Sequence, residues 1–190
     1  MFNLSPVLIL LSSVVALISP VIYITAILKG QARPHRTTRV ILLLTAVLST
    51  AALLAQHDRV AIWLAGIATI QSVVILGLSL KYGMGGWSPT DIWCLLVALA
   101  GIVVWQTTQN PILALYASIA ADFIGVIPTI IKTFHWPKTE IVTFYFLDTI
   151  AATLSLLAIR TWSIPSMSYP LYILLVNLGM VLLILRPAKK

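Results

Sequence analysis

The chain has 190 residues, of which 60% are hydrophobic and only 9% are charged. A typical soluble domain has roughly 25% charged residues, because a surface that faces water has to be covered by polar groups. The composition therefore predicts an integral membrane protein. The single cysteine, Cys94, excludes an internal disulfide and any metal site built from several cysteines.

Seven apolar segments are long enough to span a bilayer as helices, which takes about 20 residues each. The first segment has no positively charged start and continues to residue 28, so we expect a retained span and not a cleaved signal peptide. The sequence therefore predicts an all-α integral membrane fold with seven transmembrane helices. In chain order, the predicted spans are 5–28, 39–56, 60–80, 91–108, 111–132, 140–159 and 168–186.

Positive charge is divided unevenly between the two sides of this predicted bundle. Ten of the twelve Lys/Arg residues fall in the first, third and fifth connections and in the C-terminal tail, and the other two are Arg59 and Arg160. Basic loops stay in the cytoplasm, so we expect the N-terminus outside and the C-terminus inside a bacterial inner membrane. The most basic connection, KGQARPHRTTR at 29–39, is then a topology anchor that contacts anionic lipid headgroups. We expect no nucleic-acid binding from so short a loop.

This basic connection has a counterpart 103 residues further along the chain. Lys29 and Pro34 align with Lys132 and Pro137, and the same offset pairs the Leu-Leu-Ala runs at 53–55 and 156–158. The offset places the first predicted helix on the fifth and the second on the sixth, each pair in the same orientation. The predicted domains are residues 1–80 and 110–190, two parallel three-helix repeats, with 81–109 as a linker helix.

This three-one-three plan resembles the SWEET and PQ-loop superfamily of seven-helix membrane proteins. The segment DFIGVIPTIIK, from Asp122 to Lys132, is similar to the superfamily motif in which Pro-Gln precedes a basic helix end, with Thr129 in place of Gln. The resemblance implies two bundles that rock about a central cavity. SWEET transporters use four helix prolines as hinges, but the second and sixth helices here lack interior prolines. Sugar specificity is therefore not carried over.

Asp122 and Asp148 lie near the centres of predicted spans, where an Asp costs on the order of 3 kcal/mol to insert. A desolvated carboxyl group favours its neutral form and can take up and release a proton. The two aspartates therefore either bind substrate or protons, or join helices as neutral hydrogen-bonding groups. The remaining acids, Asp58, Asp91 and Glu140, lie near helix ends and are expected to be solvated. Small or hydroxylated neighbours at helical spacing include Ser118, Gly125, Thr129, Tyr145, Ala152 and Ser155.

Further polar groups and three prolines complete the predicted site. SWEET-type transporters place an asparagine in helices 3 and 7 at the substrate site. The resemblance puts Asn177 at the helix-7 position, and Gln71 lies in the third predicted helix. Either amide equally suits a hydrogen bond between helices. Prolines inside helices remove a backbone hydrogen bond and act as hinges or as simple kinks. The predicted substrate-binding or proton-coupling residues are Asp122, Asp148, Asn177, Tyr145, Thr129, Ser118 and Gln71, and the predicted hinges are Pro20, Pro128 and Pro170.

These observations favour a transporter that moves a small polar solute by alternating access, with proton coupling as an option. The alternative is a seven-helix receptor or scaffold that binds a peptide or protein partner without transport. An intramembrane enzyme ranks third, and we expect no enzymatic activity. No cofactor or metal site is expected either, because His35, His57 and His135 are dispersed among the connections. The expected partners are the solute and anionic lipids, and a homo-oligomer is also allowed.

Overall fold

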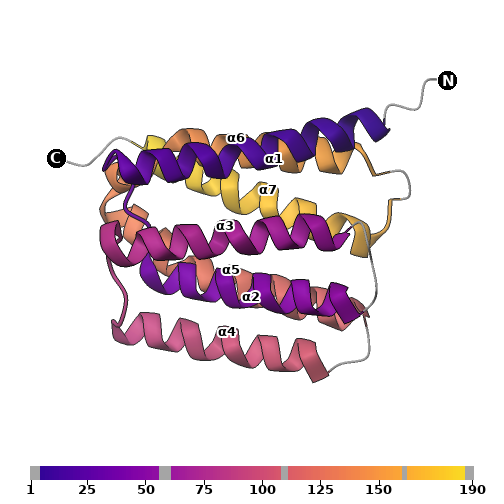
Figure 1. Cartoon of the computed structure of the whole chain (residues 1–190), viewed down its shortest axis with the longest axis horizontal. Coiled ribbons are helices and arrows are strands. Elements are labelled where there is room, and N and C mark those ends of the chain that lie inside the picture. The colour runs from indigo at the N-terminus through magenta and orange to yellow at the C-terminus, as the bar shows by residue number, and fades with distance from the viewer. Residues whose placement is uncertain (1–4, 56–60, 108–110, 160–161, 187–190) are drawn as a thin grey trace. The chain divides into compact units, whose positions relative to one another are not determined.

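The computed structural model describes residues 5–55, 61–107, 111–159 and 162–186. In these ranges the chain forms seven α-helices, one short 3-10 helix and no strand, so the predicted all-helical fold is confirmed (Figure 1). Asp58, Arg59, His57 and Arg160 lie outside the described ranges. The helices are α1 (Ser5–Leu28), α2 (Arg36–Ala55), α3 (Ala61–Tyr82), α4 (Pro89–Thr107), α5 (Pro111–His135), η1 (Pro137–Thr139), α6 (Val142–Leu157) and α7 (Ile164–Leu185).

Two of the described helices are long and apolar enough to cross a membrane. These are the segments Pro6–Leu28 of α1 and Met167–Leu185 of α7. Shorter apolar helical stretches are Thr69–Tyr82, Pro89–Val104 and Val142–Leu157. The described part of the chain is therefore compatible with membrane association through two helices.

The helices belong to two compact units. Unit 1 comprises Met1–Ala32 and Thr133–Lys190, with α1, α6 and α7, and unit 2 comprises Arg33–Lys132, with α2 to α5. Each unit combines the first helix of one predicted repeat with the last two helices of the other, and unit 2 also contains α4. This division differs from the predicted one at residues 80 and 109. The predicted boundaries mark a repeat in the sequence, and a repeat does not have to form its own compact unit, so they stay a prediction.

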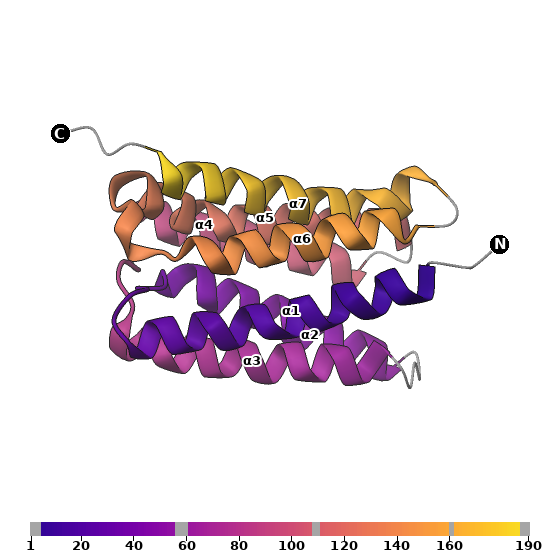
Figure 2. The same ribbon diagram turned by 90° about the horizontal axis from the view of Figure 1, so that it is seen from above.

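In unit 1, α6 packs against both α1 and α7 (Figures 1 and 2). Polar side chains of α1 form a line along α6. The Ser12 hydroxyl donates to the Ala151 carbonyl at 3.0 Å, and the Ser19 hydroxyl donates to the Phe144 carbonyl at 3.3 Å. Spacings of seven and four residues put Ser12, Ser19 and Tyr23 on one face of α1. Such hydrogen bonds join helices whose surfaces are otherwise apolar.

In unit 2, α2 packs against α3 and α4. A buried cluster of Ile41, Ala98, Ile102 and Ala121 joins α2, α4 and α5. Gly125 lets α5 approach α2 closely, because a Cβ atom at this position would lie 2.6 Å from Ile41 Cγ2. The small residues Ala121 and Gly125 therefore determine how near these helices come.

The loop from α3 to α4 is tightly folded. Gly85, Gly86 and Trp87 have positive φ angles of 70°, 96° and 72°. At the start of α4, the Ser88 backbone N–H donates to the Asp91 carboxylate at 3.0 Å, and the Asp91 N–H donates to the Ser88 hydroxyl at 3.1 Å. This reciprocal pair satisfies backbone donors that a helix start leaves without partners.

Candidate functional site

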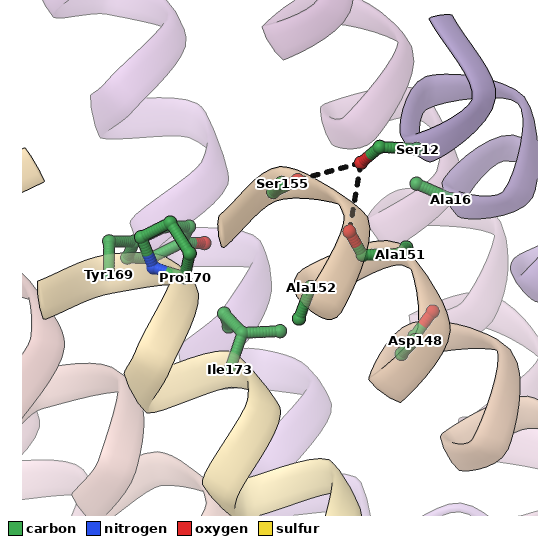
Figure 3. A pocket seen from close by; sticks show the side chains of 9 residues that line it. All are labelled: Ser12, Ala16, Asp148, Ala151, Ala152, Ser155, Tyr169, Pro170 and Ile173. Carbon is green, nitrogen blue, oxygen red and sulfur yellow. Dashed lines mark hydrogen bonds between the residues drawn. The ribbon is translucent and has the colours of Figure 1, made fainter. Parts of the chain in front are cut away.

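Unit 1 contains a pocket of ≈ 210 Å³ where α1, α6 and α7 meet (Figure 3). Asp148 lies on its α6 wall, one turn before Ala151 and Ala152, and the facing α7 contributes Pro170. Small side chains leave this space open, and Asp148 is the one charged residue among the described residues that line it. The lining residues are Ser12, Ala16, Asp148, Ala151, Ala152, Ser155, Tyr169, Pro170 and Ile173.

The two serines of the pocket are hydrogen-bonded to each other and to the backbone of α6 (Figure 3). Ser12 Oγ lies 2.7 Å from Ser155 Oγ, and Ser12 donates its proton to the Ala151 carbonyl. A hydroxyl group has only one proton, so Ser155 is the donor of the bond between the serines. Both hydroxyl protons are therefore used within the wall, and lone pairs of oxygen remain for a ligand.

Unit 1 has two described prolines inside helices, Pro20 of α1 and Pro170 of α7, as predicted. Proline has no backbone N–H, so Pro20 cannot provide the helical bond to the carbonyl of Ala16, which is a lining residue. Pro170 lines the pocket itself and likewise cannot bond to the carbonyl of Ser166. Their role as hinges stays a prediction.

The other predicted residues of unit 1 lie outside this set of lining residues. Tyr145 is 5% exposed and packs edge-on against Phe144, with ring centroids 4.9 Å apart. Asn177 is 9% exposed, and its amide donates to the Ile173 carbonyl of the same helix at 2.8 Å. Part of the hydrogen-bonding capacity of Asn177 is thus used within α7.

The remaining predicted residues belong to unit 2. Asp122, Thr129 and Pro128 lie on α5, and Gln71 lies on α3. The buried Thr129 hydroxyl donates to the Thr38 hydroxyl at 2.9 Å, which joins α5 to α2. The structure does not describe the side chain of Ser118. The predicted site residues are thus divided between two units, and whether both groups line one cavity stays a prediction.

Two acids that were expected to be solvated are buried, so that expectation is wrong. Glu140 is 4% exposed, and the Tyr23 hydroxyl donates to its carboxylate, 2.9 Å from Oε2 and 3.1 Å from Oε1. Asp91 is 5% exposed and lies 3.5 Å from His35 Nε2. Position near a helix end does not ensure solvation where a residue from a distant segment, such as Tyr23 or His35, packs against the acid.

The basic connection 29–39 is part of the packed structure of its units. Arg36 donates to the Gly85 carbonyl at 3.1 Å, and the Lys132 ammonium donates to the Arg33 carbonyl. Lys132 is 3% exposed and Arg39 is 9% exposed. These cations are held by the fold, and the predicted contact with anionic lipids stays a prediction.

Sequence reasoning missed several of these polar contacts, although signals for two of them were present. Ser12, Ser19 and Tyr23 recur at helical spacing in the first apolar segment, which marks a polar face. Ser88 followed by Asp91 has the spacing of a helix cap. The contact of Tyr23 with Glu140 has no local signal, because 117 residues separate the partners.

Comparisons of the chain with protein-family models, with curated proteins and with solved structures give no match. What the fold and the site define is an all-helical protein with a small, acid-containing pocket inside a three-helix unit. Its function has to follow from the chemistry of that pocket.

Proposed function

We propose that the protein is a membrane transporter that moves a small polar solute by alternating access. The observation that carries this proposal is the ≈ 210 Å³ pocket of unit 1, where Asp148 and two serines lie among apolar helices. Drug-sized ligands occupy pockets of about 300–1,000 Å³, so this space suits a smaller solute. Two further features support the proposal. They are the resemblance to the SWEET and PQ-loop superfamily and the prolines inside α1, α5 and α7 of this chain.

The proposed setting is a bacterial inner membrane, spanned seven times with the N-terminus outside. The composition and the distribution of basic residues support this topology. Large apolar side chains are also exposed on helices other than α1 and α7, including Ile70 of α3 at 67% and Val103 of α4 at 60%. Lipid contact would remove the cost of exposing these groups to water.

Asp122 and Asp148 are the carboxyl groups that would carry protons if transport is proton-coupled. An acid inside a membrane helix is costly and usually serves an ion or substrate pathway. Asp148 has the stronger case, because it lines a pocket. We expect Asp148→Asn to abolish coupling to a pH gradient, since the amide cannot exchange a proton at this position.

The test begins with the thermal stability of the purified protein against sugars, amino acids, nucleosides and vitamins. A ligand that binds the folded state raises stability in proportion to affinity and concentration. Saturable uptake of the stabilising solute into proteoliposomes is expected, with at least a tenfold loss of kcat/KM in Asp148→Asn. Ser13→Ala is the matched control for pocket changes, because Ser13 is not a lining residue and its hydroxyl donates to the Ile9 carbonyl of its own helix.

Three results would overturn the transport proposal. A peptide or protein that binds tightly while no solute crosses the vesicle membrane would favour the receptor alternative. A solute that is chemically converted, with conversion lost in a single-residue variant, would favour an enzyme. Uptake that does not saturate and is equal in empty vesicles would also count against transport.

A further inference from the structure

Unit 2 has a pocket of its own at the end of the helices that adjoins the basic connection 29–39. Its volume is ≈ 60 Å³, which is room for roughly two water molecules at about 30 Å³ each. The apolar part of its wall consists of Val40 of α2, Leu80 of α3, and Ile92 and Leu95 of α4. A space of this size and lining holds a short piece of hydrocarbon chain and encloses no whole molecule of drug size.

The pocket continues into an exposed apolar surface. Leu80 and Ile92 line the pocket and are also exposed on its outside. Leu96, one helical turn after Ile92, is exposed as well. In water such a surface would be costly, whereas in a membrane it lies against lipid chains. A chain that enters the pocket can therefore continue along α4.

Arg36 provides a fixed positive charge in the same wall. Its guanidinium donates to the Gly85 carbonyl at 3.1 Å and to the Leu80 carbonyl at 3.5 Å. The Gly86 backbone packs on its stem, since a Cβ atom on that glycine would lie 3.3 Å from Arg36 Cβ. The described contacts use two of the five N–H groups of an arginine side chain, so the others can serve a ligand. Phosphate oxygens match the fork geometry of these groups.

The acid in this wall does not neutralise Arg36. Asp91 accepts the Ser88 backbone N–H through Oδ2, and its Oδ1 lies 3.5 Å from His35 Nε2. Both carboxylate oxygens are thus engaged with other groups. Among the described residues, no acid forms an ion pair with Arg36. The pocket therefore combines an apolar wall with a cation whose charge is not balanced locally.

Trp87 extends this wall at the predicted cytoplasmic end of the helices. It lines the pocket, is 78% exposed and has a φ angle of 72°. Positive φ is rare for a bulky residue and persists only where the surrounding structure imposes it. The loop thus holds a large indole ring in an exposed position. Tryptophan is typical of the level of lipid headgroups.

We infer that this pocket binds one anionic phospholipid, with its phosphate on Arg36 and part of one acyl chain against Val40, Leu80 and Ile92. The basic connection attracts anionic lipids in general by its charge, whereas the inference assigns one site to one arginine and one apolar wall. It goes beyond the proposed function and takes from it only the setting in a membrane.

Ligands that differ in one respect test the inference on the whole 190-residue chain in a nonionic detergent. The probes are phosphatidylglycerol, phosphatidylcholine with the same acyl chains, and sn-glycerol 3-phosphate, which has no chains. Each is titrated against thermal stability, which rises with the affinity of a ligand for the folded state. We expect an apparent affinity for phosphatidylglycerol at least about tenfold above that for phosphatidylcholine, and no stabilisation by sn-glycerol 3-phosphate. Equal affinities for the two lipids, or equal stabilisation by the phosphate without chains, would overturn the inference.

Two arginines of the same connection provide matched charge variants. Arg36→Gln and Arg33→Gln change the net charge equally, but Arg33 is exposed and is not a lining residue. Arg36→Gln should lower the preference for phosphatidylglycerol about tenfold, because it removes the charge at the site. Arg33→Gln should keep the preference of the wild type. Equal losses in both variants would show a general electrostatic attraction and would overturn the assigned site.

A second pair of variants tests the location without changing charge, since Arg36→Gln also removes bonds to backbone carbonyls. Val40→Phe should fill the pocket and weaken binding of phosphatidylglycerol at least about tenfold. Val47→Phe is the control, because Val47 lies two turns further on the same face of α2, is exposed and is not a lining residue. It should bind as the wild type does. Unchanged affinity in folded Val40→Phe protein would refute the location.

Lipid binding and transport can fail independently. A preference for phosphatidylglycerol that Arg36→Gln removes, in a protein without saturable flux of any solute, would support the inference and refute transport. Saturable uptake into vesicles of phosphatidylcholine alone, with equal affinities for the two lipids, would support transport and refute the inference.

Discussion

At the scale of single residues, a buried polar contact joins α1 to the segment before α6. The Tyr23 side chain is fully buried, its hydroxyl donates to the Glu140 carboxylate, and its ring stacks on Phe144 with centroids 4.4 Å apart. A carboxylate removed from water needs donors for its lone pairs. Tyr23 therefore stabilises unit 1 through both its ring and its hydroxyl.

Tyr23→Phe keeps the ring and removes the donor. We expect the free energy of unfolding to fall by about 1–3 kcal/mol, because a buried acceptor loses one of its partners. The measurement is reversible unfolding of the protein in mixed micelles. Tyr82→Phe is the control, since Tyr82 is 36% exposed, and it should change stability by less than about 0.5 kcal/mol. Equal effects of the two changes would show that the Tyr23 hydroxyl adds nothing specific.

At the scale of helices, close approach depends on small residues at the contact. Gly125 of α5 faces Ile41 of α2, and Gly101 of α4 faces Ala121 of α5, where an added Cβ would lie 3.2 Å from the Ala121 Cβ. In a membrane, dispersion contacts between closely packed helices replace the hydrophobic effect as the source of stability. The geometry of unit 2 therefore depends on these positions.

Gly125→Ala is expected to destabilise the protein by about 1–3 kcal/mol through overpacking against Ile41. Gly179→Ala in α7 is the matched control, because nothing lies within 4 Å of its added Cβ atom. A double-mutant cycle with Ile41→Ala measures the coupling directly, and the two changes should be far from additive. Additive effects would mean that Gly125 and Ile41 do not limit the approach of these helices.

At the scale of the whole molecule, the helix contacts within the two units correspond to one another, while the sequence repeat itself stays a prediction. In unit 1, α1 packs on α6 and α6 on α7. In unit 2, α5 packs on α2 and α2 on α3. With an offset of 103 residues, these two patterns are equivalent. Each unit thus contains the first helix of one predicted repeat and the last two helices of the other.

The topology can be tested at α6, which is the shortest of the described α-helices. Its 16 residues rise about 24 Å, against a hydrocarbon thickness of about 30 Å. In a Cys94→Ala background, we expect Lys138→Cys to react only with reagents on the cytoplasmic side, and Ser163→Cys only on the outer side. Both positions are exposed. The Cys94→Ala protein alone should remain unlabelled. Labelling of both cysteines from one side would show that α6 does not span the membrane.

The sequence by itself determined the helices and singled out four residues that line the pocket of unit 1, namely Asp148, Ala152, Ser155 and Pro170. Long apolar runs with polar breaks predicted all seven helices to within a few residues, because helix formation is local and apolar length is visible in the sequence. The cost of an acid in an apolar helix marks Asp148 whatever surrounds it in the fold. The same cost marks Asp122 equally, and only the fold separated the two.

Only the tertiary structure decided which helices share a unit and which polar groups meet. Ser12 and Ser155 are 143 residues apart, and no local pattern indicates that they touch. The burial of Glu140 and Asp91 likewise depends on Tyr23 and His35, which lie in distant segments. Local sequence governs hydrogen bonding within a helix, whereas contacts between helices depend on how complementary faces pack, and that is a property of the folded chain.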